Sequence, residues 1–219
     1  MKPKQTMIFI LFIIIASFNT IGCNNFGIHG SGIIKDEQRD ISDFDAVEVG
    51  GFYDVEIRCG KKPNLVIIGD DNLIPLIKTE VRGNTLHIWN KKHISPRRKI
   101  KIQITTENLT DINCSGASKI FATNINSDDF LVEASGACNI RIIGNTDELT
   151  INSSGASNVN AERMKAKVVR VDLNGASHAT VYSSEELRAD ISGVGVVNYS
   201  GNPKVIKKRI SGLGSINQN

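Results

Sequence analysis

Two aspartates have the residue type and spacing that catalysis by paired carboxylates requires. Asp172 and Asp190 each lie three residues before a glycine of a repeated unit described below. If the units stack as adjacent coils, the two side chains are expected about 5 Å apart on one sheet. That separation is close to the one that retaining glycoside hydrolases use. Arg170 and Arg188 precede them, and strand alternation is expected to direct these arginines to the other face.

The column that holds the two aspartates also runs through units without an acid pair. Glu133 and Asn152 occupy the equivalent position in the two preceding units. A column that mixes an acid, an amide and two aspartates is typical of a solvated polar exterior. Because fold analogy alone does not establish catalysis, we favour an exterior polar ladder, and a polysaccharide lyase or hydrolase remains the alternative.

Other catalytic and cofactor motifs are missing from the chain. It has no Gly-x-Ser-x-Gly elbow and no Gly-Lys-Ser/Thr phosphate loop. The segments 193–195 and 212–214 read Gly-Val-Gly and Gly-Leu-Gly, but they lack the third glycine of a dinucleotide-binding loop. The four histidines are scattered, and no cysteine pair has CxxC spacing. We therefore predict no catalytic residues, no metal site and no cofactor.

The first residues resemble a bacterial lipoprotein signal. Lys2 and Lys4 precede an apolar run from Met7 to Phe18, which is shorter than the roughly 20 residues of a membrane span. Cys23 directly follows a glycine, as in a lipobox. We expect residues 1–22 to be cleaved, Cys23 to carry lipid, and residues 23–40 to form a flexible tether. A plain cleaved signal and an uncleaved anchor are the alternatives.

The remaining cysteines and the net charge indicate no particular function. Cys59, Cys114 and Cys138 are an odd number for an exported protein. We expect buried thiols, with one disulfide left open. The formal charge of +3 falls to +1 when the two lysines of the leader are removed, which does not favour nucleic-acid binding.

One run of the chain is distinctly basic. We interpret it as a solvated loop, and contact with an acidic glycan or a lipid head group is the alternative. Its cationic residues are Lys91, Lys92, His93, Arg97, Arg98, Lys99 and Lys101.

The second half of the chain repeats a unit centred on glycine. Six units, four of which contain Gly-Ala after a serine or asparagine, follow one another with glycine spacings of 20, 19, 20, 18 and 19 residues. The central glycines are Gly116, Gly136, Gly155, Gly175, Gly193 and Gly212, and Gly51 occupies a similar strand-Gly-strand context in the first half. Such a glycine allows either a positive φ or a backbone approach too close for a Cβ. We expect the Ser/Asn residue before each glycine to hydrogen-bond the corner backbone.

The flanks of the glycine also repeat. Positions two, four and six before it are mostly apolar and alternate with polar residues, and an apolar residue recurs four positions after it. This is the pattern of strands with one buried face. Units of this length bury a core only by stacking. We therefore predict an all-β, parallel β-helix or β-solenoid, with coils of about 19–20 residues and glycine-centred corners.

The domain is expected to span residues 41–219, with irregular opening coils at 44–110 and six regular repeats at 111–219. In the opening part, residues 65–68, 85–88 and 100–104 are predicted strands, and residues 82–84 are a predicted turn. Residues 73–77 are expected to form one helical turn capped by Asp71 or Asn72.

Three segments of the first half, together with the Ser-Gly-Ala-Ser units, carry a family resemblance. They are Val49–Val55, Gly69–Ile74 and Thr79–Val81. They resemble the head GIN domain family, described as auto-transporter adhesins and common in Bacteroidetes, over roughly residues 40–216. The resemblance implies an exported β-helical protein and supplies no catalytic or binding motif.

The expected role is a non-enzymatic surface interaction in the cell envelope, on the periplasmic or outer-surface side. The expected partners are the membrane, through the lipid, and a surface glycan or protein ligand. An envelope sensor or scaffold is a further alternative. The last repeat ends at Ile216, and the open end of the solenoid is expected to pair into a homodimer.

Overall fold

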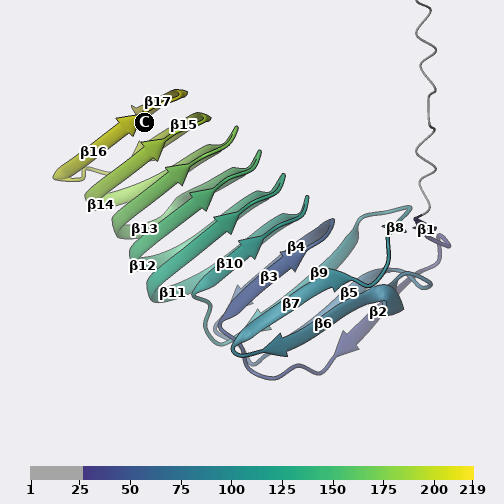
Figure 1. Ribbon diagram of the computed structural model, residues 1–219. Helices are drawn as coiled ribbons and strands as arrows, with labels where there is room; N and C mark the ends of the chain where they lie inside the picture. Colours follow the sequence, from purple (N-terminus) through teal and green to yellow (C-terminus); the bar gives the residue numbers. More distant parts are fainter. Residues whose placement is uncertain (1–26) are drawn as a thin grey trace, which may run out of the picture.

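The computed structural model describes residues 27–219, which form a column of stacked coils with a broader opening end (Figure 1). The predicted signal peptide and Cys23 lie outside the described residues. Within residues 27–219, seventeen strands and one 3-10 helix follow one another. They are β1 (Ile28–His29), β2 (Ile34–Arg39), β3 (Ala46–Gly50), β4 (Tyr53–Cys59), β5 (Asn64–Asp70), η1 (Ile74–Leu76), β6 (Ile77–Arg82), β7 (Thr85–Asn90), β8 (Ile94–Ser95), β9 (Ile100–Thr106), β10 (Asp111–Cys114), β11 (Lys119–Ala134), β12 (Asn139–Ser153), β13 (Asn158–Leu173), β14 (His178–Ile191), β15 (Val194–Ser200), β16 (Val205–Ile210) and β17 (Leu213–Gln218).

The regular coils stack in parallel, as the repeats predict. From β10 to β14 each strand pairs with the next in parallel, so that Ile112 aligns with Val132 and then with Ile151. The long strands β11 to β14 each contribute to two sides of the coil. The pre-glycine face contains β7, β3, β10, the C-terminal parts of β11 to β14, and β16. The post-glycine face contains β9, β4, the N-terminal parts of β11 to β14, β15 and β17. The predicted parallel β-solenoid is confirmed.

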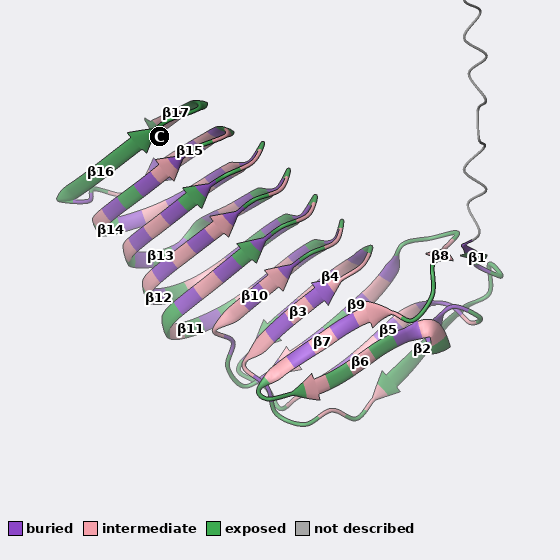
Figure 2. Cartoon of the chain, viewed as in Figure 1, coloured by how far each residue is buried: buried purple, intermediate pink, exposed green. Residues whose placement is uncertain are grey.

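Burial alternates along these strands with a period of two (Figure 2). The inward columns are filled by aliphatic side chains, such as Val132, Ile151 and Val171, each at most 1% exposed. Stacking places the same apolar position of successive coils in contact, so a unit of about 20 residues gains a core only from its neighbours. In β16, at the far end of the column, every residue is exposed.

The opening end is not built only from wider coils of the same kind. β3 and β4 join the parallel stack, but β2–β5, β5–β9 and β6–β7 pair antiparallel. β6 and β7 are separated by Gly83, with φ of +51°, and Asn84. A turn this short returns the chain directly alongside itself, which forces antiparallel pairing. The turn at 82–84 was predicted correctly, whereas the irregular opening coils expected at 44–110 are only partly present, because β5 and β6 pair antiparallel.

Two local expectations for the opening end also need correction. Residues 34–39, within the segment expected to be a tether, form β2 and pair with β5 from Ile34↔Asp70 to Arg39↔Leu65. The helical turn at residues 74–76 is present, but its N-cap residue is Leu73 and no side chain caps it. Asp71 instead accepts a hydrogen bond from Ser31 Oγ, and Asn72 Oδ1 accepts one from Ser31 N. Both side chains therefore hydrogen-bond to Ser31, in the segment before β2, and do not cap the helix.

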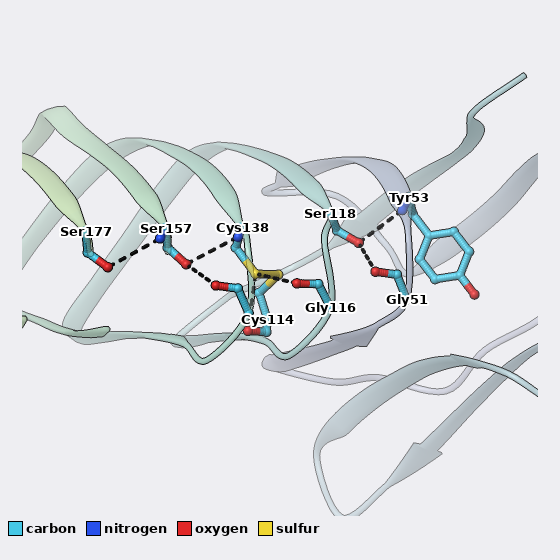
Figure 3. The surroundings of a disulfide bond; sticks show 9 residues. Gly51, Tyr53, Cys114, Gly116, Ser118, Cys138, Ser157 and Ser177 are labelled. Atoms are coloured by element: carbon cyan, nitrogen blue, oxygen red, sulfur yellow. Dashed lines mark hydrogen bonds between the residues drawn. A yellow bond between two sulfur atoms is a disulfide. The ribbon is translucent and has the colours of Figure 1, made fainter. Parts of the chain in front are cut away.

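Two of the cysteines expected to be buried thiols form a disulfide. Cys114 lies two residues before one corner glycine and Cys138 two residues after the next, and stacking brings their Cα atoms to 6.4 Å (Figure 3). The bond therefore joins neighbouring coils at the first regular corner. Cys59 is a buried free thiol. Burial raises its pKa to about 11.

Candidate functional site

The corner glycines form a column in which each backbone lies directly against the previous one. A Cβ placed on Gly116 would lie 2.0 Å from Gly51 O. The corresponding distances for the five later corner glycines, to the carbonyl oxygen of the preceding corner, are 1.9–2.2 Å. Yet none of these glycines has a positive φ. Of the two reasons considered for glycine, close approach is therefore the one that applies.

The side chains that hydrogen-bond the corner lie after the glycine, not before it. Ser157 Oγ donates to Gly136 O at 3.0 Å and accepts from Cys138 N at 3.2 Å. Ser118 makes the same pair of bonds with Gly51 O and Tyr53 N (Figure 3). The Ser/Asn residues before the glycines are exposed. The expectation that the Ser/Asn residue before each glycine binds the corner backbone was wrong. The buried serines two residues after the glycine make these bonds, so their role is structural.

The predicted ladder of Glu133, Asn152, Asp172 and Asp190 exists on the pre-glycine face. The register pairs Glu133 with Asn152, Asn152 with Asp172, and Asp172 with Asp190. Asn113 Nδ2 also donates to Glu133 Oε2 at 3.2 Å. The stacking of the two aspartates is therefore as expected from the repeat.

The arginines beside this ladder lie on the same outward face, so their expected orientation was wrong. Arg170 and Asp172 are two residues apart, and a strand returns to the same face every second residue. Arg170 pairs with Glu148, and Arg209 pairs with Asp190 at 3.4 Å. Nearby, a hydrogen bond from Lys207 lowers the pKa of Glu186. Within the ladder Asp190 is thus ion-paired, Glu133 binds an amide and Asp172 is exposed.

A hollow of about 490 Å³ lies on the opposite, post-glycine face. It crosses β4, β9, β11, β12 and β13 and joins the last opening strands to the first regular coils. Its lining combines one aromatic ring with amides, cations and carboxylates. The lining residues are Asp54, Val55, Glu56, Lys101, Lys119, Phe121, Asn139, Arg141, Asn158 and Asn160.

One side of this hollow is electrostatically paired. Lys101 Nζ lies 2.9 Å from Glu56 Oε1, and Gln103 Nε2 donates to Glu56 Oε2 at 3.4 Å. These contacts lower the pKa of Glu56, with the Lys101 hydrogen bond as the main cause. Glu56 is therefore ionised at neutral pH, and its two oxygens already contact Lys101 and Gln103.

The other side of the hollow presents groups that are free to bind a ligand. The Arg141 guanidinium lies 5.7 Å from the centroid of the half-buried Phe121 ring. Asn139 and Asn158 are exposed and stand in register on neighbouring strands. Strand spacing of about 4.8 Å sets the interval between such amides. The result is an apolar ring bordered by a cation and a row of hydrogen-bonding groups.

Sequence reasoning missed this hollow although its pattern was present. Asn139 and Asn158 lie three residues after their corner glycines, while Phe121, Arg141 and Asn160 lie five after theirs. Aligning the outward positions after the glycine would have revealed both columns. The contribution of Asp54, Glu56 and Lys101 requires the register between β4, β9 and β11, which the irregular spacing of the opening region hides.

Residues 27–219 contain no group of three or more His, Cys, Asp or Glu side chains arranged to hold a metal ion. Within the same range, no helix has the length and apolar character needed to cross a membrane.

The fold and its exposed, mixed-polarity hollow define a parallel β-solenoid with a surface suited to binding. The chain belongs to the family described as "Putative auto-transporter adhesin, head GIN domain", whose model matches residues 43–203. No curated protein matches the chain in sequence.

Solved structures from Bacteroides and Parabacteroides species share the fold. A putative adhesin from Bacteroides fragilis superposes with a TM-score of 0.71 at 23% identity, covering 88% of this chain and 100% of the other. A putative lipid binding protein from Parabacteroides distasonis gives a TM-score of 0.56 at 24% identity, covering 88% and 99%. A putative adhesin from Parabacteroides merdae gives 0.54 at 20% identity, with the same coverage. At these identities the likeness shows the fold alone.

Proposed function

We propose that this chain is an exported, lipid-anchored and non-enzymatic surface protein that binds glycans in the post-glycine hollow. Membership of an adhesin-named family supports a role at the cell surface. The observation that carries the proposal is the Phe121 ring bordered by Arg141 and by the amides of Asn139 and Asn158. The proposal selects a glycan over a protein ligand because of the chemistry of this border.

A sugar ring combines an apolar C–H face with hydroxyl groups that both donate and accept hydrogen bonds. The Phe121 ring offers the apolar surface. Each asparagine amide offers two donors and an acceptor, and so matches a hydroxyl in either role. The hollow continues across several parallel strands, so an extended oligosaccharide fits it better than a compact ligand.

The ladder on the pre-glycine face supports the non-enzymatic part of the proposal. Catalysis by paired carboxylates requires that both flank the scissile bond of a bound substrate. Asp172 is exposed, and Asp190 is paired with Arg209. Neither carboxylate lines the post-glycine hollow. The polysaccharide-active alternative predicts product release from a glycan that Asp172→Ala abolishes.

The binding part is tested on a glycan array with the purified protein and two matched variants. Phe121→Ala removes the ring in the hollow, whereas Tyr182→Ala removes another half-buried ring that lies under a cation, Lys165, outside this hollow. We expect Phe121→Ala to lose the glycans that the protein retains, by about tenfold or more in Kd. Tyr182→Ala should bind as the parent does. Equal binding by both variants would contradict the proposed site.

The anchor is tested separately in cells. Metabolic labelling with an alkyne fatty acid should mark the protein, and Cys23→Ala should abolish the label. Label that persists in Cys23→Ala would overturn the assignment of this cysteine.

A further inference from the structure

The opening end joins the start of the described chain to the basic loop between β7 and β9. β1 pairs in parallel with β8, and Ile28 N donates to His93 O at 2.9 Å. Gly30 N donates to Ser95 O at 3.0 Å. In Figure 1, β1 and β8 lie together at the opening end, away from β17. The basic run of the sequence therefore lies where the chain enters the fold.

This loop carries cations that the described part of the chain leaves uncompensated. Between residues 81 and 106 the sequence contains no acidic residue. Lys99 pairs with Asp54 at 3.5 Å. Lys91, Lys92 and Arg98 are exposed and have no carboxylate of residues 27–219 within ion-pair distance. A loop that contacts only solvent needs no such concentration of positive charge.

Exposed apolar side chains accompany these cations. Ile28, Ile33 and Ile34 are 36%, 59% and 41% exposed. Phe52 is 47% exposed, and Lys99 Nζ lies 5.1 Å from the centroid of its ring. Cations interspersed with exposed large apolar groups are the composition of a surface that lies in a membrane interface.

A buried carboxylate fixes the loop to the entering chain. Asp70 is fully buried, and its two oxygens accept hydrogen bonds from Gly32 N at 2.7 Å and Arg97 N at 3.2 Å. Arg97 Nε also donates to Gly30 O at 3.1 Å. Asp71 is likewise occupied, since it accepts a hydrogen bond from Ser31 Oγ and lies 3.9 Å from Lys35. The basic loop is therefore joined to the entering chain through Asp70 and Arg97.

We propose that this surface, the opening-end patch, docks on the anionic phospholipid surface of the membrane that carries the protein. The patch comprises Ile28, Ile33, Lys91, Lys92 and Arg98, with Phe52 and Lys99 beside them. The proposal rests on the proposed anchor at Cys23, because four residues reach at most about 14 Å and so keep Gly27 near the bilayer. One lipid anchor holds a protein only marginally, and a polybasic patch supplies the second attachment. Docking here directs the far end of the stacked coils, at β17, away from the membrane.

The experiment uses Trp89, the single tryptophan of the chain, which lies on β7 two residues before Lys91. The full protein, purified from membranes, is reconstituted into vesicles that contain a dansyl head-group lipid. One set is phosphatidylcholine alone, and the other also contains phosphatidylglycerol. We expect stronger energy transfer from Trp89 to dansyl on the anionic vesicles. In 1 M NaCl the excess should disappear, because the Debye length falls to about 3 Å.

Two charge-reversal variants with the same total change complete the test. Lys91→Glu/Lys92→Glu/Arg98→Glu should lose the excess transfer on anionic vesicles. Arg163→Glu/Lys204→Glu/Lys208→Glu, which alters exposed cations of the coils outside the post-glycine hollow, should keep it. Equal transfer on the two vesicle types, or an excess that survives the loop reversal, would overturn the proposal. So would loss of polygalacturonate binding in the loop variant without any dependence on lipid charge, since the patch would then bind an acidic glycan.

This result is independent of the fatty-acid labelling that tests the anchor. A protein that is not labelled at Cys23 but still shows transfer dependent on lipid charge would contradict the anchor and retain the docking surface. A labelled protein whose energy transfer does not depend on lipid charge would support the anchor and contradict the docking surface.

Discussion

The regular coils and the opening end bury similar aliphatic side chains but are held together by different contacts. In the coils, the backbone of each corner packs against the backbone of the corner before it. Each corner glycine lies against the carbonyl group of the preceding corner glycine. At the opening end, side chains make the decisive contacts. Asp70 holds two loops, and the buried Tyr53 donates its hydroxyl to Asn90. Burial raises the pKa of Tyr53, so this donor stays protonated.

This difference explains where the sequence repeats and where it does not. A contact between backbones constrains the same position in every coil, so the glycine recurs. A contact between particular side chains constrains only the residues that make it. The comparison therefore predicts that one methyl group is costly in a coil corner and that single polar groups matter most at the opening end.

The largest effect should come from Gly155→Ala. The new Cβ would lie 2.1 Å from Gly136 O, and a backbone atom paired in a parallel stack cannot move away alone. We expect the free energy of unfolding to fall by about 4 kcal/mol, beyond the usual cost of overpacking. Urea denaturation measures it. Gly83→Ala is the control, because nothing lies within 4 Å of its Cβ and only its left-handed φ costs about 1 kcal/mol. Similar losses of unfolding free energy in both variants would show that close backbone approach at the corner does not set the cost.

Removing the disulfide should have the next largest effect. Cys114 and Cys138 are 24 residues apart. Opening a loop of this length increases the entropy of the unfolded chain, so Cys114→Ala/Cys138→Ala should cost about 3 kcal/mol. Cys59→Ala, which removes a buried thiol without opening a loop, should cost only about 1 kcal/mol. If the double variant were as stable as Cys59→Ala, the regular coils would not depend on their first cross-link.

Asp70→Asn should destabilise the opening end alone. The amide nitrogen cannot accept a hydrogen bond, so either Gly32 N or Arg97 N loses its partner. We expect a local cost of about 2 kcal/mol, seen as faster amide hydrogen exchange in β1 and β2 and unchanged exchange in β12 and β13. Asp71→Asn, at a partly exposed neighbour, should change exchange little. Faster exchange throughout the coils would show that the two regions unfold as one unit.

The smallest effect should come from Asp172→Ala on the exterior ladder. Asp172 is exposed, so its removal should change the free energy of unfolding by no more than about 0.5 kcal/mol. Val171→Ala, which shortens the inward neighbour, should cost about 2 kcal/mol. Thermal denaturation of the two variants tests this contrast. A large loss in Asp172→Ala would mean that the ladder carries stability that its exposure does not suggest.

The sequence predicted the regular coils far better than the opening end. Alternation around each glycine identified the inward columns, because a buried face recurs every second residue in any strand. The same alternation does not distinguish parallel from antiparallel pairing, so β2, β5 and β6 were assigned to coils or to a tether. The candidate site was missed for a related reason. Phe121 and Asn158 lie in repeat positions, but Glu56 and Lys101 reach them only through the register of β4 and β9.

The sequence by itself determined that the chain stacks about 20 residues at a time, which positions face inward, and where each corner falls. Period-two alternation and a constant repeat length are local properties, and they suffice for that. Only the tertiary structure decided that the corner needs glycine for close approach rather than for a positive φ. It also decided that Cys114 pairs with Cys138, that the buried serines after the glycine bind the corner, and that the basic loop lies beside the entering chain. Each of these depends on the distance between segments that stacking brings together, and no residue encodes that distance locally.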